Sequence, residues 1–150
     1  MSLLIFMKQS VIIFFLLFSS FIVFADDTFP DINNYWLRAA PPNAMMMAAY
    51  GDLNNDTDKQ KILIGAYSPD FGMAEIHKTI ITDGVARMVH QAEIIIKPHE
   101  QLSFKPGGLH IMLMQPSKTI STGDKIKICL IYRQGDMESV QHIMFPVIKK

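Results

Sequence analysis

The sequence predicts an all-β domain, folded as a sandwich or small barrel of about eight to nine short strands. Short runs rich in Ile, Val, Tyr and Met recur after residue 44, and turn-forming residues separate them. No stretch after residue 25 keeps the apolar period of a helix. Two apolar faces built from such strands can be buried only by closing on each other.

The expected strands are the runs in which apolar residues alternate or cluster between turn signals. In chain order they cover residues 45–53, 62–67, 73–81, 85–89, 93–97, 101–104, 109–114, 125–132 and 140–147. Asp83-Gly84 lies between two of these runs and is a strong signal for a β-hairpin. The other connections carry the turn signals Asn54-Asn55-Asp56, Ser68-Pro69-Asp70, Pro106-Gly107-Gly108, Gly123-Asp124 and Gln134-Gly135-Asp136.

Residues 1–25 have the order of a secretory signal peptide. Lys8 is their only charge, an apolar run follows at 11–18, and Val23 and Ala25 fit the positions that signal peptidase reads. We expect cleavage after Ala25, export to the periplasm, and one working domain over residues 26–150. The alternative is an uncleaved anchor, but its apolar run is shorter than the roughly 20 residues of a spanning helix. No cysteine follows the apolar run, which argues against a lipid anchor.

Charge and cysteine content exclude several classes of protein. The chain has 14 basic and 14 acidic residues and no basic cluster, so we expect no nucleic-acid partner. Its single cysteine, Cys129, cannot form an internal disulfide, a CxxC pair or a four-cysteine zinc site, and its apolar surroundings predict burial. No nucleophile elbow or phosphate loop is found, so we expect no enzymatic activity. We also expect a monomer.

Histidine and methionine occur together at strand spacing. In a strand, alternate residues share a face, so His110, Met112 and Met114 project together while Ile111 and Leu113 enter the opposite layer. Thioether sulfur is soft and neutral, and it favours Cu(I) over zinc, calcium or magnesium. The alternative is structural, because methionine is a common core filler.

A second pair of candidate ligands lies around the Asp83-Gly84 turn. Glu75 and His77 share one strand face, and Met88 follows on the other side of the hairpin. The hairpin brings His77 and Met88 within reach of each other, although this argument leaves their register open. The structural alternative is a surface histidine and a packing methionine.

These four residues resemble the ligand pattern of the PCu(A)C family of periplasmic copper chaperones. The pattern is His77, ten residues, Met88, twenty-one residues, His110, one residue, Met112. The surrounding segments are also similar to the family, from about Trp36 to Tyr132: YWLRAAPPNA at 35–44, AAYGDL at 48–53, DGVARM at 83–88 and PGGLHIMLM at 106–114.

The resemblance implies a cupredoxin-like β-sandwich that carries one Cu(I) ion near its surface. His77, Met88, His110 and Met112 would be the ligands, and the dinuclear copper centre in cytochrome c oxidase subunit II would receive the ion. Lys78-Thr79 departs from the family, in which many relatives have a methionine close by, and the sequence up to Lys150 lacks the tail rich in His and Met of some members. We therefore expect one site.

Several alternatives remain at this point. A copper-storing or detoxifying binder would use the same site without delivery, and a structural or adhesion module would bind no metal. A blue-copper centre could use Cys129, His142 and Met144, but twelve residues between Cys and His is too long for its tight ligand loop. Glu75, His77 and His110 could form a zinc hydrolase site, which would not explain the methionines.

The remaining histidines and methionines carry weaker expectations. His90 and His99 flank polar turns and have no partner at ligand spacing. Met45, Met46 and Met47 could supply copper to the site, but alternation sends Met46 to the face opposite its neighbours, and packing in the core is the better interpretation for at least one of them.

Overall fold

The computed structural model describes residues 29–150, and ten strands make up most of this range. They are β1 (Asp31–Arg38), β2 (Met46–Asn54), β3 (Lys61–Tyr67), β4 (Phe71–Thr82), β5 (Val85–His90), β6 (Ile94–Ile96), β7 (Gln101–Phe104), β8 (Leu109–Pro116), β9 (Lys125–Gln134) and β10 (Met137–Ile148). Within this range no helix is long and apolar enough to cross a membrane. The predicted signal peptide, residues 1–25, and its cleavage site lie outside the described residues.

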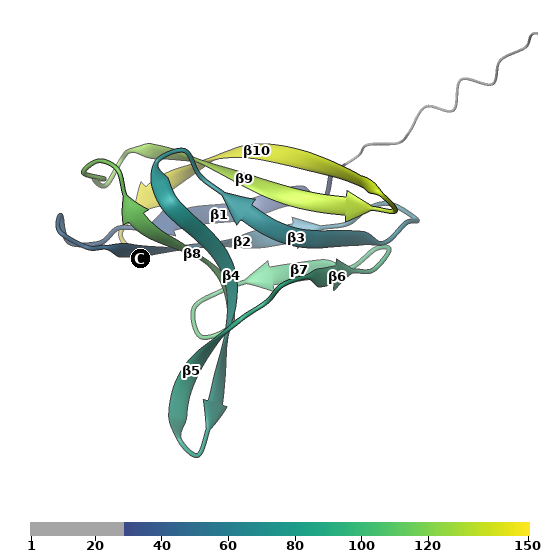
Figure 1. The fold of residues 1–150 in the computed structure, drawn as a ribbon, viewed down its shortest axis with the longest axis horizontal. Coiled ribbons are helices and arrows are strands. Elements are labelled where there is room, and N and C mark those ends of the chain that lie inside the picture. The colour runs from purple at the N-terminus through teal and green to yellow at the C-terminus, as the bar shows by residue number, and fades with distance from the viewer. Residues whose placement is uncertain (1–28) are drawn as a thin grey trace, which may run out of the picture.

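The strands form two layers (Figure 1). In the first layer, β5, β4, β8, β2 and β1 are neighbours, and β7 pairs with the second half of β2. The second layer contains β10, β9, β3 and β6. A parallel pairing between β1 and β10 joins the two layers along one edge. The all-β sandwich that the sequence predicts is therefore confirmed.

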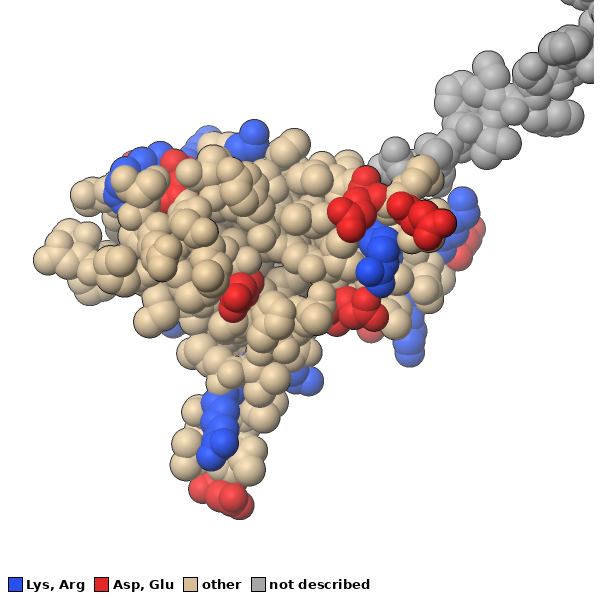
Figure 2. Space-filling view, viewed as in Figure 1, with Lys and Arg blue, Asp and Glu red and all other residues tan. Residues whose placement is uncertain are grey.

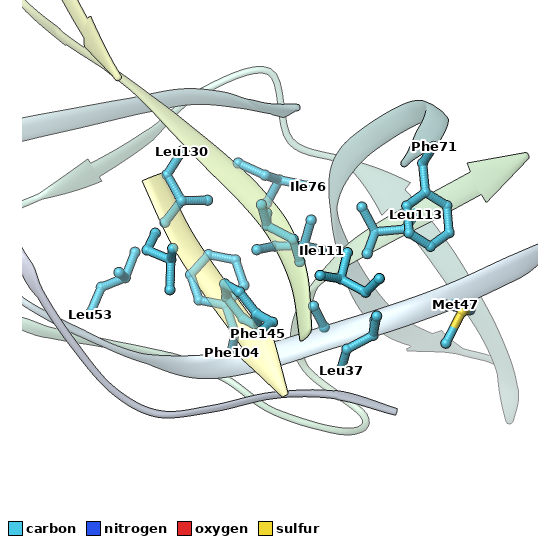
Figure 3. Close-up of a cluster of buried hydrophobic side chains, with 14 of the residues drawn as sticks. Leu37, Met47, Leu53, Phe71, Ile76, Phe104, Ile111, Leu113, Leu130 and Phe145 are labelled. Atoms are coloured by element: carbon cyan, nitrogen blue, oxygen red, sulfur yellow. The ribbon is translucent and has the colours of Figure 1, made fainter. Parts of the chain in front are cut away.

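Apolar side chains from both layers fill the space between them. Ile76, Ile111 and Leu113 point inward from β4 and β8 and meet Leu130 and Phe145 from the second layer (Figure 3). Burying residues of this kind stabilises the fold by about 1.5–3 kcal/mol each. Among the described residues, 29–150, the buried members of this core lie between residues 37 and 147, and we expect residues 26–150 to fold without the leading segment.

Strand β1 is the one element that the sequence analysis missed, and it brings the number of strands to ten. Its polar first half hides the pattern, because Asp31, Asn33 and Asn34 interrupt the apolar alternation. Asn34 has a positive φ of 51°, and the β1–β2 register shifts between Asn33 and Trp36. The Asn34 side chain donates a hydrogen bond to Asp52, which lowers the pKa of that carboxyl below its ordinary value.

The β4–β5 hairpin extends away from the sandwich (Figure 1). Thr82 pairs with Val85, so the turn consists of Asp83 and Gly84 alone, both at positive φ, as the sequence predicts. Every residue of β5 is exposed. Figure 2 shows positive and negative side chains along this hairpin, whereas the neighbouring body of the molecule shows few charges on that face.

We predict that Leu37→Ala lowers the free energy of unfolding by about 2–5 kcal/mol. Leu37 is 0% exposed in β1, and the truncation leaves a cavity between β1 and the second layer. Urea unfolding of residues 26–150, followed by circular dichroism, measures the change. The control is Asn33→Ala at an exposed position of the same strand, and equal stability of the two variants would contradict the placement of β1 in the core.

Candidate metal centre

Three histidines lie side by side across neighbouring strands. His77 of β4 pairs with His110 of β8 on one side and with His90 of β5 on the other. Directly paired residues share a face of the sheet, so the three rings project together. The ring centroids of His77 and His110 are 5.9 Å apart, and those of His77 and His90 are also 5.9 Å apart. We call these residues the histidine row.

The histidine row occupies the outer face of the first layer. Ile76 and Ile111 alternate with the histidines and point into the core. His110 is nevertheless only 4% exposed, because Tyr50 of β2 lies beside it with ring centroids 6.5 Å apart. Trp36 packs against Tyr50 in turn, so aromatic side chains cover one side of His110.

One hydrogen bond fixes the tautomer of His110. Its Nδ1 atom lies 3.1 Å from the carbonyl oxygen of Gly108. A carbonyl only accepts, so Nδ1 carries the proton and Nε2 keeps a free lone pair. That Nε2 atom is buried and has no hydrogen-bond partner among the described residues. Metal-binding histidines are commonly held in this way through their other nitrogen.

His77 has the complementary arrangement. Its Nε2 atom lies 2.8 Å from a carboxylate oxygen of Glu75, which accepts the hydrogen bond. The Nδ1 atom of His77 therefore has the free lone pair, and it too is buried without a partner within residues 29–150. Burying an unpaired polar atom is costly, so both atoms point to a bound group.

The spacing of the two rings fits one shared metal ion. Two imidazoles that bind an ion at about 2.0 Å hold their ring centroids no more than about 6.3 Å apart. The observed 5.9 Å between His77 and His110 lies within this limit.

Met112 and Met88 project from the same face, on opposite sides of the histidine row. Met112 follows His110 by two residues on β8 and pairs with Glu75, whereas Met88 pairs with Thr79 on the hairpin. Each methionine is thus a diagonal neighbour of His77, about 7–8 Å away at the backbone and within reach of a long side chain. Met112 is half-buried, and Met88 is 60% exposed.

Glu75 and His90 are additional candidates that the sequence analysis undervalued. Each of the three residues Glu75, His77 and His90 offers one potential ligand atom, and these atoms lie within 4.8 Å of one another. The Nδ1 atom of His90 is 3.9 Å from a carboxylate oxygen of Glu75. The statement that His90 has no partner is therefore wrong. The two-residue turn was the signal in the sequence that could have revealed this neighbour. Once Thr82 pairs with Val85, the same register pairs His77 with His90.

The three consecutive methionines separate as alternation predicts. Met47 is buried in the core, whereas Met46 is exposed on the same face as Met112. Met45 precedes β2 and is also exposed.

Cys129 and His142 lie on the outer face of the second layer. Cys129 is buried, as predicted, and its Sγ atom is 3.1 Å from His142 Nδ1, because the two residues pair directly between β9 and β10. Cys129 and His142 are thus neighbours in space, although twelve residues separate them in sequence. A blue-copper centre needs a second histidine, but the other four described histidines lie on β4, β5, β8 and the β6–β7 loop.

Comparisons of the sequence with known proteins match the chain to a family. A sequence model of the LpqE-like family, described as "Putative lipoprotein LpqE-like", matches residues 31–145. The "Putative lipoprotein Lxx21020" of Leifsonia xyli subsp. xyli is 30% identical over 110 residues, which cover 73% of this chain and 65% of the relative. The "Uncharacterized protein RP573" of Rickettsia prowazekii is 35% identical over 94 residues, or 62% of this chain and 52% of the relative. This chain thus spans less than two thirds of either relative.

Solved structures of PCuAC domains share the fold. The copper-bound PCuAC domain from PmoF2 has a TM-score of 0.64 and 24% identity, and the match covers 79% of this chain and 92% of that domain. Apo-DR1885 from Deinococcus radiodurans has a TM-score of 0.60 and 24% identity, with coverages of 83% and 82%. The chain belongs to the LpqE-like family and folds as a PCuAC domain, which confirms the resemblance to the PCu(A)C proteins.

Proposed function

We propose that the protein is an exported copper chaperone, which binds one Cu(I) ion through His77, His110, Met112 and Met88 and passes it on by ligand exchange. The observation that carries the proposal is the pair of buried, unpartnered ring nitrogens, His77 Nδ1 and His110 Nε2. They belong to rings whose spacing suits a single ion, and thioethers flank them on both sides.

The chemistry of these donors favours Cu(I). Two imidazoles and two thioethers are neutral, and the sulfurs are soft, which suits a monovalent ion better than a hard divalent ion. No thiolate takes part, so oxidation of cysteine outside the cytoplasm would leave the site intact.

The unequal burial of the donors supports stepwise transfer. His110 is enclosed by Tyr50 and held by Gly108, whereas Met88 lies exposed on the projecting hairpin. An acceptor ligand can replace Met88 first, while the histidines still hold the ion. The difference in affinity between the two sites then sets the direction of transfer.

The solved relatives support copper as the cargo. One PCuAC domain, from PmoF2, is copper-bound, and DR1885 has been solved with Cu(I). The resemblance to the PCu(A)C family suggests the dinuclear copper centre of cytochrome c oxidase subunit II as the acceptor. The leader over residues 1–25, with cleavage after Ala25, would place residues 26–150 in the periplasm. The family description and the name of one relative, both of which call the protein a putative lipoprotein, also suggest the cell envelope.

We predict that His110→Ala and Met112→Ala each weaken Cu(I) binding by about 10- to 100-fold or more, since each removes a donor. Competition titration of residues 26–150 against a chromophoric Cu(I) chelator measures the affinity. His142→Ala and Met144→Ala are matched controls on the second layer and should bind as the wild type does. Unchanged affinity in both site variants would refute this ligand set.

The proximity of Glu75, His77 and His90 favours a second candidate, the binding of a divalent ion such as Zn(II). The His90→Ala variant separates the two functions. It should keep the affinity for Cu(I) if the proposed ligands are correct. Tight Zn(II) binding that His90→Ala abolishes and Met112→Ala leaves intact would instead favour the divalent site.

Delivery is tested with the soluble copper domain of oxidase subunit II in its apo, reduced form. We predict that the loaded protein fills the acceptor faster than a small Cu(I) complex that is buffered to the same free copper concentration, because transfer proceeds through shared ligands. Copper content of the separated proteins provides the measurement. Retention of copper would favour storage or detoxification, and absence of Cu(I) binding would favour a structural module.

A further inference from the structure

Three methionines lie in register across the first layer. Met114 of β8 pairs with Met46 of β2 on one side and with Met73 of β4 on the other. We call these residues the methionine row. Paired side chains have Cβ atoms about 4.5–5.5 Å apart, so the three thioethers start from adjacent positions.

The methionine row is on the same face as the histidine row. Its strand neighbours Met47, Leu113 and Ala74 pack into or against the core, which sends Met46, Met114 and Met73 outward. Along β8, Met112 stands between Met114 and His110. Met112 and Met114 are two residues apart on the strand, which is a distance of about 7 Å.

Packing does not account for these side chains. Met46 is 60% exposed, Met73 is 46% exposed and Met114 is half-buried. Three unbranched, flexible side chains can therefore rotate until their sulfurs converge. Metal–sulfur bonds of about 2.3 Å need sulfurs roughly 4 Å apart. Met46 and Met73 lie two strand spacings apart, about 10 Å, so both side chains must lean toward Met114 between them for the three sulfurs to converge.

We propose that Met46, Met73 and Met114 form a second Cu(I) site, made of thioethers alone. This site lies outside the proposed chaperone site and does not depend on it. Three neutral sulfurs select Cu(I), because zinc and Cu(II) require nitrogen, oxygen or thiolate donors. Without imidazole or charge, the site holds the ion more weakly than the proposed chaperone site does.

Binding at the methionine row stands by itself, whereas a second role, loading of the first site, rests on the proposed chaperone function. An ion at the methionine row has Met112 as its next thioether in the direction of His110 and His77. Each step breaks one copper–sulfur bond of the methionine row and forms one bond at the first site, to the Met112 sulfur or to the unprotonated ring nitrogens of His110 and His77, so neither the oxidation state nor any proton changes.

The test is a Cu(I) titration of residues 26–150 under anaerobic conditions. We expect the wild type to bind about two Cu(I) ions, and Met46→Leu/Met73→Leu/Met114→Leu to bind about one, the weaker ion being lost. Leucine conserves volume, so the fold is retained. The matched control is Met137→Leu/Met144→Leu, which changes exposed methionines of β10 and should leave both ions bound.

A second measurement locates the ion directly. In protein labelled with 13C at the methionine methyl groups, Ag(I), a redox-inert analogue of Cu(I), should shift the Met46, Met73 and Met114 signals and leave Met137 and Met144 unchanged. Unchanged signals from the methionine row, or one ion bound to both the wild type and the triple variant, would overturn the proposal.

Different results would refute the second site and the chaperone site. In His110→Ala/Met112→Ala, one weakly bound Cu(I) should remain at the methionine row. Loss of all copper in that variant, with a single ion in the wild type, refutes the second site and leaves the chaperone site standing. A single wild-type ion that disappears only in the triple methionine variant refutes the chaperone site instead.

Discussion

The two-residue period of strands β4 and β8 is the constraint on which the rest of the molecule depends. Ile76, Ile111 and Leu113 enter the core, and the residues between them reach the outer face, so the same backbone carries both the packing and the histidines. A slip of one residue between these strands would expose the core side chains and bury the imidazoles among apolar atoms. Selection for a well-packed core therefore also fixes the relative positions of His77 and His110.

Rigidity is unevenly distributed around the histidine row. On the side of β2, Tyr50 and Trp36 cover His110, and the Gly108 carbonyl orients its ring. On the other side, β5 pairs only with β4 and all of its residues are exposed. Two backbone hydrogen bonds, Thr79 to Gly108 and Gln91 to Ile76, hold the base of the hairpin near His77. The histidine pair is thus supported by packed neighbours, whereas Met88 lies on an exposed edge strand with a single partner.

Local patterns predicted most of the strands because their apolar alternation and turns are visible within a few residues, as at Asp83-Gly84. Strand β1 escaped because a bulge at Asn34 and a polar first half disguise it, and because only its pairing with β2 and β10 defines it. The same turn could have placed His90 opposite His77. The pairing of His77 with His110 and the cover provided by Tyr50 join distant segments, which no local pattern encodes; the choice of ligands came from the family resemblance.

The sandwich separates the thiol of Cys129 from the imidazoles of the histidine row. The thiol lies on the outer face of the second layer beside His142, whereas the histidine row lies on the outer face of the first. Packed sheets are about 10 Å apart, so the full thickness of the hydrophobic core stands between sulfur and imidazoles. Thiolate, the strongest competitor for a soft metal that this chain could offer, is thereby insulated from the histidines, and damage by oxidants at one face need not spread to the other.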